Sequence, residues 1–261
     1  YTEQLHIKEI ECVDRKDQVI FESESGDSTK VKLEYGSSSW SNNYVIWLDS
    51  ADGITFREMT IRNASSFYRR VVYVSGGADN NLFRNNIIEN DDSTGSSTNS
   101  ALIYNESSAD HNLCIIDNLL YRGSYAYYGR GAWGNHDRGL IIRGNRIMRQ
   151  GYMGIEALYN QDASYQSNQL SSQSSSYWAG MDIDEASGKT RIEKNKITGP
   201  RNNERYGLYL NDFDYGDSSW ITNNFVTIGG TNTSVYGIYV EDFTMAMIFH
   251  NSVNMLQSDT N

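Results

Sequence analysis

Two nearly identical phrases decide the fold of this chain: "YGLYLNDF" at residues 206–213 and "YGIYVEDF" at residues 236–243. After the glycine of each phrase, apolar residues alternate with polar or aromatic ones, which is the period-two pattern of a short β-strand. The phrases are 30 residues apart (236 minus 206). A strand that recurs at such an interval predicts a repeating coil, in which each copy packs on the next.

A second phrase also recurs, with an apolar residue, two variable residues, Asn, one variable residue and an apolar residue. The amide of an Asn can bond to the Asn of the next coil, and Asn tolerates left-handed backbone at a bend, so we interpret these residues as structural. A degenerate earlier copy is expected at Ile54, Arg57 and Met59. The copies are Leu82-Asn85-Ile87, Ile115-Asn118-Leu120, Ile142-Asn145-Ile147, Tyr165-Asn168-Leu170, Ile192-Asn195-Ile197, Ile221-Asn224-Val226 and Ile248-Asn251-Val253.

The two phrases together give short strands in every period, and Gly, Asn, Ser and Asp fill the gaps between them. Helices have little room in such a pattern, so the chain is predicted to be all-β. Residues 1–261 are expected to form one solenoid domain of about eight to nine coils, with three short sheets around a narrow core. Pro200 is the only proline, as expected where nearly every backbone N–H bonds to the next coil.

This pattern resembles the right-handed parallel β-helix proteins, and the resemblance covers roughly residues 45–253. It implies a right-handed parallel β-helix. It does not imply one activity, because this fold carries lyases, polygalacturonases, epimerases, tailspikes, adhesins and binding modules.

The composition narrows the choice of partners. Lys and Arg total 22 against 33 Asp and Glu, which gives a net charge of −11. This charge disfavours nucleic acids and acidic polysaccharides and favours a neutral partner. No apolar run is long enough to cross a bilayer, so we expect no membrane partner. The chain opens inside a strand-like alternation, so we expect it to be a segment excised from a longer protein. We also expect a monomer, and a protein that is secreted or displayed on the cell surface.

Alternation assigns one row of side chains to the outside of the solenoid. In residues 237–240, Ile238 and Val240 are expected to point inward and Tyr239 outward. The same assignment in the other coils gives a predicted sugar-binding column of Trp47, Tyr73, Tyr104, Trp133, Glu156, Asp182, Tyr209 and Tyr239.

Six of these eight residues are aromatic. Strands about 4.8 Å apart would space the rings like successive sugars, and Tyr and Trp offer an apolar face with a polar edge. The glycine before the inward residue is expected to point outward as well and to leave open floor beside each ring, at Gly131, Gly154, Gly180, Gly207 and Gly237. Further rings could line the rim, at Tyr125, Tyr127, Tyr128, Tyr152, Tyr177 and Trp178. The alternative is that all these rings stack on one another for stability.

Two members of the column are acidic. Adjacent coils would place Glu156 and Asp182 roughly 5 Å apart, the separation of the carboxyl pair in a retaining glycosidase. Asp184 lies on the same face of the same predicted strand. Motifs of the β-helix polygalacturonases and lyases occur only in fragments, such as "MDIDE" and "GNHDRG". We therefore interpret the acidic pair as a hydrogen-bonding spot in a binding groove, with glycoside hydrolase or lyase activity as the rival reading.

Metals and cofactors leave little trace in the sequence. His6, His111, His136 and His250 have no short ligand spacing, so no transition metal and no cofactor are expected. Calcium bound by oxygen atoms in "GGADNN" or "ENDDSTG" stays open.

The phrases "SGDSTKVKL" and "NNYVIWLDSADGITFREMTI" are similar to segments of large Bacteroidetes surface proteins. The chain as a whole resembles β-helix carbohydrate-binding modules attached to secreted xylanases of gut Bacteroidetes. That resemblance implies a non-catalytic module that binds a neutral plant polysaccharide, with xylan as ligand and a catalytic domain as neighbour. The rivals are the enzyme described above and a structural or adhesive stalk.

Overall fold

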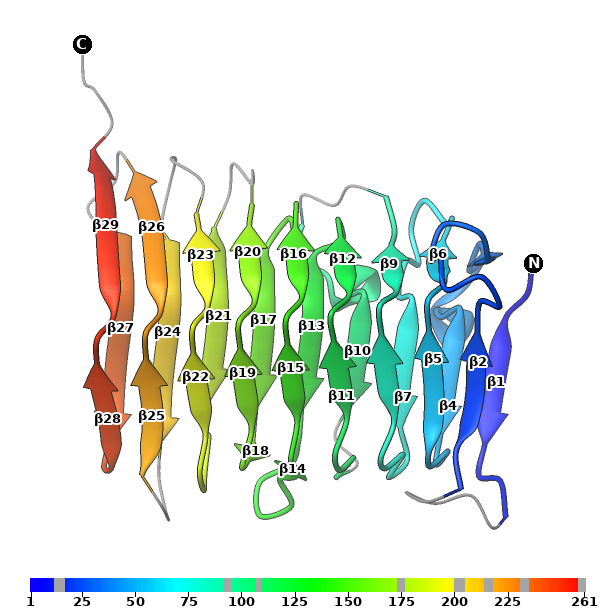
Figure 1. The fold of residues 1–261 in the computed structure, drawn as a ribbon, viewed down its shortest axis with the longest axis horizontal. Helices are drawn as coiled ribbons and strands as arrows, with labels where there is room; N and C mark the ends of the chain where they lie inside the picture. The colour runs from blue at the N-terminus through cyan, green and yellow to red at the C-terminus, as the bar shows by residue number, and fades with distance from the viewer. Residues whose placement is uncertain are drawn as a thin grey trace.

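The protein is a solenoid of stacked coils, seen in a computed structural model that describes residues 1–11, 17–91, 95–106, 109–172, 177–199, 205–213, 218–230 and 235–257. Within these residues, three parallel sheets of nine strands each run along the solenoid, with a two-stranded sheet at one corner (Figure 1). Residues 1–11 and 235–257 lie at opposite ends of the stack. This arrangement confirms the all-β, right-handed parallel β-helix, with one strand per sheet in each of nine coils.

The strands are named here by sheet. Sheet 1 contains β1 (Leu5–Lys8), β4 (Ile46–Asp49), β7 (Val72–Ser75), β10 (Ile103–Glu106), β13 (Tyr125–Arg130), β17 (Met153–Leu158), β21 (Trp178–Asp184), β24 (Arg205–Phe213) and β27 (Val235–Phe243). Sheet 2 contains β2 (Val19–Glu22), β5 (Ile54–Arg57), β8 (Leu82–Arg84), β11 (Cys114–Ile116), β15 (Ile141–Arg143), β19 (Ser164–Gln166), β22 (Arg191–Glu193), β25 (Ser219–Thr222) and β28 (Ala246–Phe249). Sheet 3 contains β3 (Lys32–Tyr35), β6 (Thr60–Asn63), β9 (Ile87–Glu89), β12 (Leu119–Tyr121), β16 (Arg146–Met148), β20 (Gln169–Ser171), β23 (Lys196–Thr198), β26 (Phe225–Gly230) and β29 (Ser252–Gln257). The corner sheet pairs β14 (Asp137–Arg138) with β18 (Asn160–Gln161), and two short 3₁₀ helices are η1 (Trp40–Asn42) and η2 (Thr98–Ser100).

The two phrases that predicted the fold lie side by side. β24 pairs in parallel with β27, with Tyr206 opposite Tyr236 and Tyr209 opposite Tyr239. The same one-coil register runs through all three sheets, so equivalent residues of successive coils form straight rows. Each row is therefore a unit of the structure, either inside the solenoid or on its wall.

A ladder of buried Asn side chains marks the turn between sheets 2 and 3. Asn145 Oδ1 accepts hydrogen bonds from the backbone N–H and the amide of Asn118, at 2.9 and 3.1 Å. Its own amide donates to Ile115 O at 2.8 Å and to Asn168 Oδ1 at 3.1 Å. The predicted hydrogen bonding between Asn residues of successive coils is confirmed.

Two details of that prediction are wrong. In the third coil the ladder residue is Asn86, which bonds to Asn118, and not Asn85. In the coil before it, the backbone N–H of Met59 bonds to Asn86, and Phe56 pairs with Phe83. The degenerate copy of the Asn phrase therefore begins at Phe56 and not at Ile54. A further correction concerns the left-handed backbone, which does not fall on the ladder Asn but on the residue before each ladder position, at Glu58, Asn85, Asp117, Gly144, Ser167, Lys194, Asn223 and His250.

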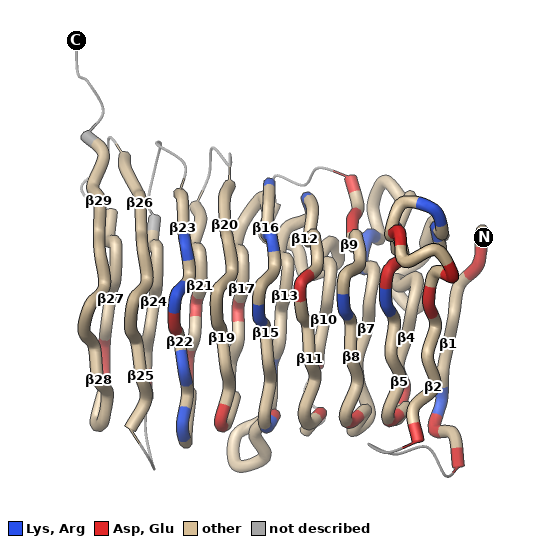
Figure 2. Tube along the Cα trace, viewed as in Figure 1, with Lys and Arg blue, Asp and Glu red and all other residues tan. Residues whose placement is uncertain are grey.

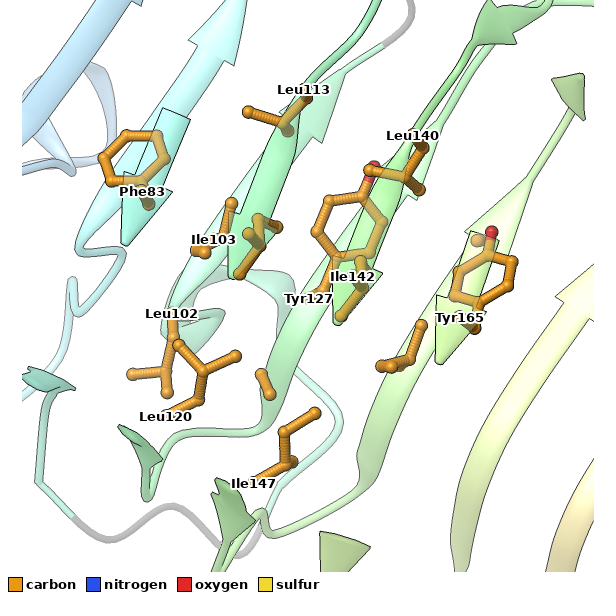
Figure 3. Close-up of a cluster of buried hydrophobic side chains, with 14 of the residues drawn as sticks. Phe83, Leu102, Ile103, Leu113, Leu120, Tyr127, Leu140, Ile142, Ile147 and Tyr165 are labelled. Atoms are coloured by element: carbon orange, nitrogen blue, oxygen red, sulfur yellow. The ribbon is translucent and has the colours of Figure 1, made fainter. Parts of the chain in front are cut away.

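The core is a narrow column of apolar rows. Phe56 stacks on Phe83 with ring centroids 5.6 Å apart. In later coils Tyr127, Ile142 and Tyr165 fill the core without exposure to solvent (Figure 3). Burying one such side chain contributes about 1.5–3 kcal/mol. Because the core is this narrow, its stability is a sum over stacked coils.

A row of glycines in sheet 1 serves close packing, and the expectation that it leaves open floor on the outside is wrong. A Cβ on Gly180 would lie 2.5 Å from the carbonyl oxygen of Gly207 and 2.6 Å from Cγ2 of Ile197 in the core. The chain bends here so tightly that any side chain would collide with the next coil. Backbone of the following coil obstructs Gly131, Gly154 and Gly207 in the same way, whereas a Cβ on Gly237 would lie 2.2 Å from Cγ1 of Val253.

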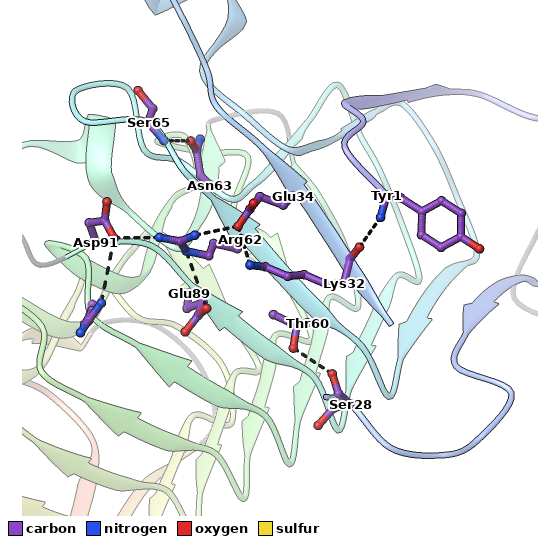
Figure 4. Close-up of polar contacts among 11 residues, drawn as sticks. Tyr1, Ser28, Lys32, Glu34, Thr60, Arg62, Asn63, Ser65, Glu89 and Asp91 are labelled. Atoms are coloured by element: carbon purple, nitrogen blue, oxygen red, sulfur yellow. Dashed lines mark hydrogen bonds and ion pairs between the residues drawn. The ribbon is translucent and has the colours of Figure 1, made fainter. Parts of the chain in front are cut away.

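Ion pairs tie the first coils together on the outer face of sheet 3. Arg62 lies between Glu34 and Asp91, with N–O distances of 2.7 and 3.1 Å, and Glu89 is 3.8 Å away (Figure 4). Because these side chains are partly exposed, each pair contributes at most about 1 kcal/mol.

Candidate active site

One outward row of sheet 1 carries most of the predicted column. The register places Trp47 opposite Tyr73, Tyr73 opposite Tyr104, Glu156 opposite Asp182, Asp182 opposite Tyr209 and Tyr209 opposite Tyr239. Seven of the eight predicted residues therefore share one wall of the solenoid: Trp47, Tyr73, Tyr104, Glu156, Asp182, Tyr209 and Tyr239.

Trp133 does not belong to this row, which corrects the prediction. β13 ends at Arg130, and the residue in the row is Tyr128, which lies opposite Tyr104 on one side and Glu156 on the other. Trp133 instead projects from a turn beyond the strand and is 76% exposed. The physical reason is that the inward residue of β13 is Tyr127, which is fully buried in the core. Most other coils have an aliphatic residue at this position, and the aromatic side chain concealed the strand from the alternation pattern.

Most rings of the row turn their faces to one another. We call His6, Trp47, Tyr73, Tyr104 and Tyr128 the first ring stack, and Tyr209 with Tyr239 the second. The rings of His6 and Trp47 are nearly parallel, with centroids 4.0 Å apart. The rings of Tyr104 and Tyr128 stack with centroids 5.3 Å apart, and those of Tyr209 and Tyr239 with centroids 5.2 Å apart. Rings stacked in this way present their edges and hydroxyl groups to solvent, so the stacking alternative describes much of the column.

Part of the first ring stack is covered. The guanidinium of Arg70 lies 3.5 Å from the centre of the Tyr104 ring, and Tyr104 is only 6% exposed. Of the rings expected on the rim, Tyr127 and Trp178 are core residues, whereas Tyr152 and Tyr177 lie on the outer face. The outer face of the row is therefore closed at Tyr104.

A cleft opens where the row of rings is interrupted by Glu156 and Asp182. In the neighbouring row, Tyr125 is followed by Met153 and Ala179 before rings resume at Tyr206. These two smaller side chains leave a hollow of about 400 Å³. Its walls include Tyr152, Tyr177, Tyr206, Tyr209, Glu156, Asp182 and Asp184.

The two carboxyl groups in this cleft hold their protons unusually tightly. Burial raises the pKa of Glu156 to about 7, with Asp184 adding to the rise and the charge of Arg130 opposing it. Burial also raises the pKa of Asp182 to about 7, and the negative charges of Glu156 and Asp184 raise it further. Near neutral pH the pair therefore holds both a carboxylic acid and a carboxylate.

Asp184 has a different environment on the same strand. Its Oδ1 accepts hydrogen bonds from the backbone N–H of Glu185 at 3.0 Å and from the amide of Asn211 at 2.9 Å. These hydrogen bonds fix the side chain at the cleft edge. Figure 2 shows acidic residues on β17 and β21, whereas Lys and Arg are prominent on β22 and β23 of the other sheets.

Sequence reasoning found both carboxyl groups but missed Tyr128 and Tyr206 as parts of the wall. Tyr206 precedes the glycine of the phrase at residues 206–213, and the chain bends at that glycine, so alternation places its side chain on the wrong side. The sequence did contain a signal for this second row, because Tyr206 recurs as Tyr236 in the next coil. In the structure the two rings stack with centroids 5.2 Å apart.

Solved structures share the fold at low sequence identity. A lacto-N-biosidase of family GH136 from Eubacterium ramulus matches with a TM-score of 0.51 and 10% identity, over 97% of this chain and 60% of that one. The Dettilon tailspike protein matches with a TM-score of 0.48 and 12% identity, over 97% of this chain and 54% of that one. The pectate lyase Pel9A gives a TM-score of 0.45 and 11% identity, over 95% and 69%. The chain thus spans about 60% or less of the first two structures, and the sequence matches none of the curated proteins compared with it.

The expectation that this chain is a non-catalytic module is wrong. A lacto-N-biosidase, which is an enzyme, has the same fold over nearly the whole length of the chain, so the architecture is not one reserved for binding modules. The cleft also contains a pair of carboxyl groups with pKa values of about 7, and perturbed pairs of this kind are characteristic of active sites.

A family model described as "Periplasmic copper-binding protein (NosD)" matches residues 116–258. The described residues do not fit a copper site, because no three His, Cys, Asp or Glu side chains among them are grouped in a way that could hold a metal ion. Two of the histidines have other partners, since His6 lies 2.9 Å from Asp49 and His136 lies 2.9 Å from Ser187. These contacts lie in different coils, so the two histidines do not share a site. We therefore assign no copper site to the described residues.

The same description agrees with a location outside the cytoplasm. Among the residues that the structure describes, there is no helix with the length and apolarity to span a membrane. Because the matched residues make up more than half of the 261 in the chain, the chain belongs to the NosD family.

Proposed function

We propose that this chain is a glycoside hydrolase that binds a neutral polysaccharide along the outer face of sheet 1 and cleaves it between Glu156 and Asp182. The observation that carries the proposal is the cleft itself, where two carboxyl groups with pKa values of about 7 interrupt a row of tyrosines. Paired carboxyl groups are the usual means of breaking a glycosidic bond, and aromatic walls are the usual surface for sugars.

The choice of a neutral substrate rests on charge. The chain carries a net charge of −11, and the cleft adds Asp184 to the catalytic pair. An acidic polymer would be repelled by both. We take xylan as the first candidate because of the resemblance to xylan-binding β-helix modules, and we propose that the protein acts on it after secretion or at the cell surface.

Tyrosine edges suit this substrate. Because the rings of each stack face one another, their hydroxyl groups are the atoms available to a glycan chain lying along the wall. Tyr209 has a ring partner on the side of Tyr239 and a carboxyl neighbour, Asp182, on the other. We propose that sugars on either side of the cleaved bond contact Tyr128 and Tyr209, with Trp47, Tyr73 and Tyr239 extending the same track.

The charges around the pair assign the two roles. Arg130 favours the carboxylate of Glu156, and that carboxylate in turn raises the pKa of Asp182. Glu156 is therefore the nucleophile, and Asp182 is the general acid. In the first step Asp182 protonates the glycosidic oxygen as the bond to the anomeric carbon breaks, and a Glu156 oxygen forms a bond to that carbon.

In the second step Asp182, now a carboxylate, accepts a proton from water. The resulting hydroxide adds to the anomeric carbon, and the bond to Glu156 breaks. Both carboxyl groups then return to their starting protonation states. Neighbouring strands are about 4.8 Å apart, which is close to the carboxyl spacing of retaining enzymes and leaves no room for a water between the groups.

The test is release of reducing sugar from birch xylan, cellulose, galactomannan and a lacto-N-biose-terminated oligosaccharide. We expect hydrolysis of at least one neutral glycan, and a loss of about 10²- to 10⁴-fold in kcat for both Glu156→Gln and Asp182→Asn.

Glu193→Gln is the matched control. Glu193 is on β22, in the coil that contains Asp182, but it faces outward from sheet 2 and accepts a hydrogen bond from Gln166 at 3.2 Å. Its activity should equal that of the wild type. If Glu156→Gln and Asp182→Asn hydrolyse as fast as this control, the proposed catalytic pair is wrong.

A further inference from the structure

A second pocket lies beyond the end of β13, built around the exposed Trp133. Ala132 and Asn135 exchange backbone hydrogen bonds of 3.2 and 2.9 Å, which close a tight turn with Trp133 and Gly134 at its centre. Gly134 has a φ of +73°, as the second central residue of a type II turn does. The turn therefore holds the indole away from the solenoid wall in a defined position.

The ring of Trp133 has one aromatic neighbour. Tyr159 lies at 6.2 Å with an interplanar angle of 88°, so it contacts the indole edge to face. Trp133 remains 76% exposed. The indole face is therefore open to a ligand that enters the hollow beside it.

Polar side chains surround the hollow of about 430 Å³ beside this ring. Glu185 directly follows β21 and Asp212 lies near the end of β24, and both have positive φ, of 50° and 49°. His136 Nδ1 is 2.9 Å from Ser187 Oγ, and this bond ties the turn to the next coils. The residues that line this hollow include Trp133, His136, Arg138, Gln161, Glu185 and Asp212.

This pocket borders the cleft of the candidate active site. Leu158 and Asp184 line the cleft, and each is followed within a few residues by pocket residues, Gln161 and Glu185. β14 and β18 mark this corner in Figure 1, at the end of β13 and β17. A substituent on a polymer bound in the cleft would therefore reach the pocket.

We infer that the Trp133 pocket binds a neutral sugar that branches from the main chain of the substrate. The inference rests on the proposed function, because the main chain must occupy the cleft. The indole face matches the C–H face of a pyranose or furanose ring. The carboxylates of Glu185 and Asp212 accept hydrogen bonds from sugar hydroxyl groups, and Gln161 and Arg138 donate to them.

The test compares branched with linear probes of equal main-chain length. Three pairs are titrated by calorimetry: xylohexaose with and without an arabinosyl branch, cellohexaose with and without xylosyl branches, and mannohexaose with and without a galactosyl branch. Wild-type protein should bind one branched probe more tightly than its linear partner. Trp133→Ala should weaken that branched probe about tenfold, the effect of losing one aromatic contact of this kind, and leave the linear probe within about twofold.

Trp40→Ala is the control, since Trp40 is 68% exposed but lies in η1, near the N-terminal end of the solenoid and away from the pocket. It should change neither affinity, and both variants should keep the wild-type unfolding temperature. Equal weakening of linear and branched probes by Trp133→Ala, or no preference for any branched probe in the wild type, would overturn the inference. Hydrolysis of the linear probes, measured in parallel, reports on the proposed function alone, since it does not require Trp133.

Discussion

At the scale of single residues, Asp137 is a buried carboxyl group at the corner between sheets 1 and 2. It is 1% exposed, and burial together with the charge of Asp110 raises its pKa to about 7. Its Oδ1 accepts the backbone N–H of Asp110 at 3.1 Å, and its Oδ2 lies 3.1 Å from the Asn105 amide nitrogen. Asn105 Oδ1 is buried without a partner among the described residues, and turning this amide round would let the oxygen accept a hydrogen bond from the protonated carboxyl group of Asp137.

This geometry predicts that Asp137→Asn is tolerated and weakens the pH dependence of stability. The pKa is higher in the folded state than the ordinary 3.8, so the folded state binds the proton more tightly. The stabilisation by this group is therefore present at low pH and is lost as pH rises from about 4 to about 7. An Asn amide mimics the protonated acid at every pH. The variant should be more stable than the wild type at about pH 8, by on the order of 2 kcal/mol, and nearly equal to it at about pH 4.

Urea unfolding followed by circular dichroism at both pH values measures this difference. Glu156 and Asp182 titrate in the same range in both proteins, so subtracting one curve from the other isolates Asp137. A variant less stable than the wild type at about pH 8 would show that the carboxylate, rather than the acid, is the native form.

At the scale of structural elements, the Asn ladder joins sheets 2 and 3 through hydrogen bonds between coils. Asn145 is fully buried in the middle of the ladder, and its side chain both accepts from Asn118 and donates to Ile115 and Asn168. Asn251, in the last coil, accepts from Asn224 and donates to Ile221 at 2.7 Å, but it is only partly buried.

We predict that Asn145→Ala lowers the free energy of unfolding by about 3–5 kcal/mol, because it leaves buried donors and acceptors in two neighbouring coils without partners. Asn251→Ala should cost about 1–2 kcal/mol, since water can reach the groups that it exposes. Urea unfolding of both variants provides the comparison. Equal losses would mean that the ladder is no more important in the middle of the solenoid than at its end.

The sequence was sufficient to predict the strands, their repeat and the outward row, because a one-coil register needs only alternation and spacing. It failed where alternation breaks. Asn85 and Asn86 are adjacent, so either could be the ladder residue. The choice depends on which residue three positions earlier is buried, and in the structure this is Phe83. The bend at Gly180 and its equivalents reverses the side of the preceding residue, which is why Tyr206 was missed. Trp133 was misplaced because no strand signal separates β13 from the turn that follows it.

At the scale of the whole molecule, the solenoid turns a small motif into a long surface. The row on sheet 1 passes through all nine coils, from His6 to Tyr239, yet the cleft occupies only the coils in which the rings give way to Glu156 and Asp182. The carboxyl pair was predictable from the repeat, but its chemistry was not. The raised pKa values depend on burial by Tyr152 and Tyr177 from adjoining turns, and sequence spacing does not report burial.

The central claim is that two carboxyl groups one strand apart cleave a glycan by successive displacements at one carbon. Time-resolved proton NMR of wild-type protein with xylohexaose measures the anomeric configuration of the first product. The account predicts that the new reducing end appears first as the β anomer, the configuration of the bond that was cleaved, and equilibrates later. First appearance of the α anomer, or no new anomeric signal from xylohexaose, would contradict it.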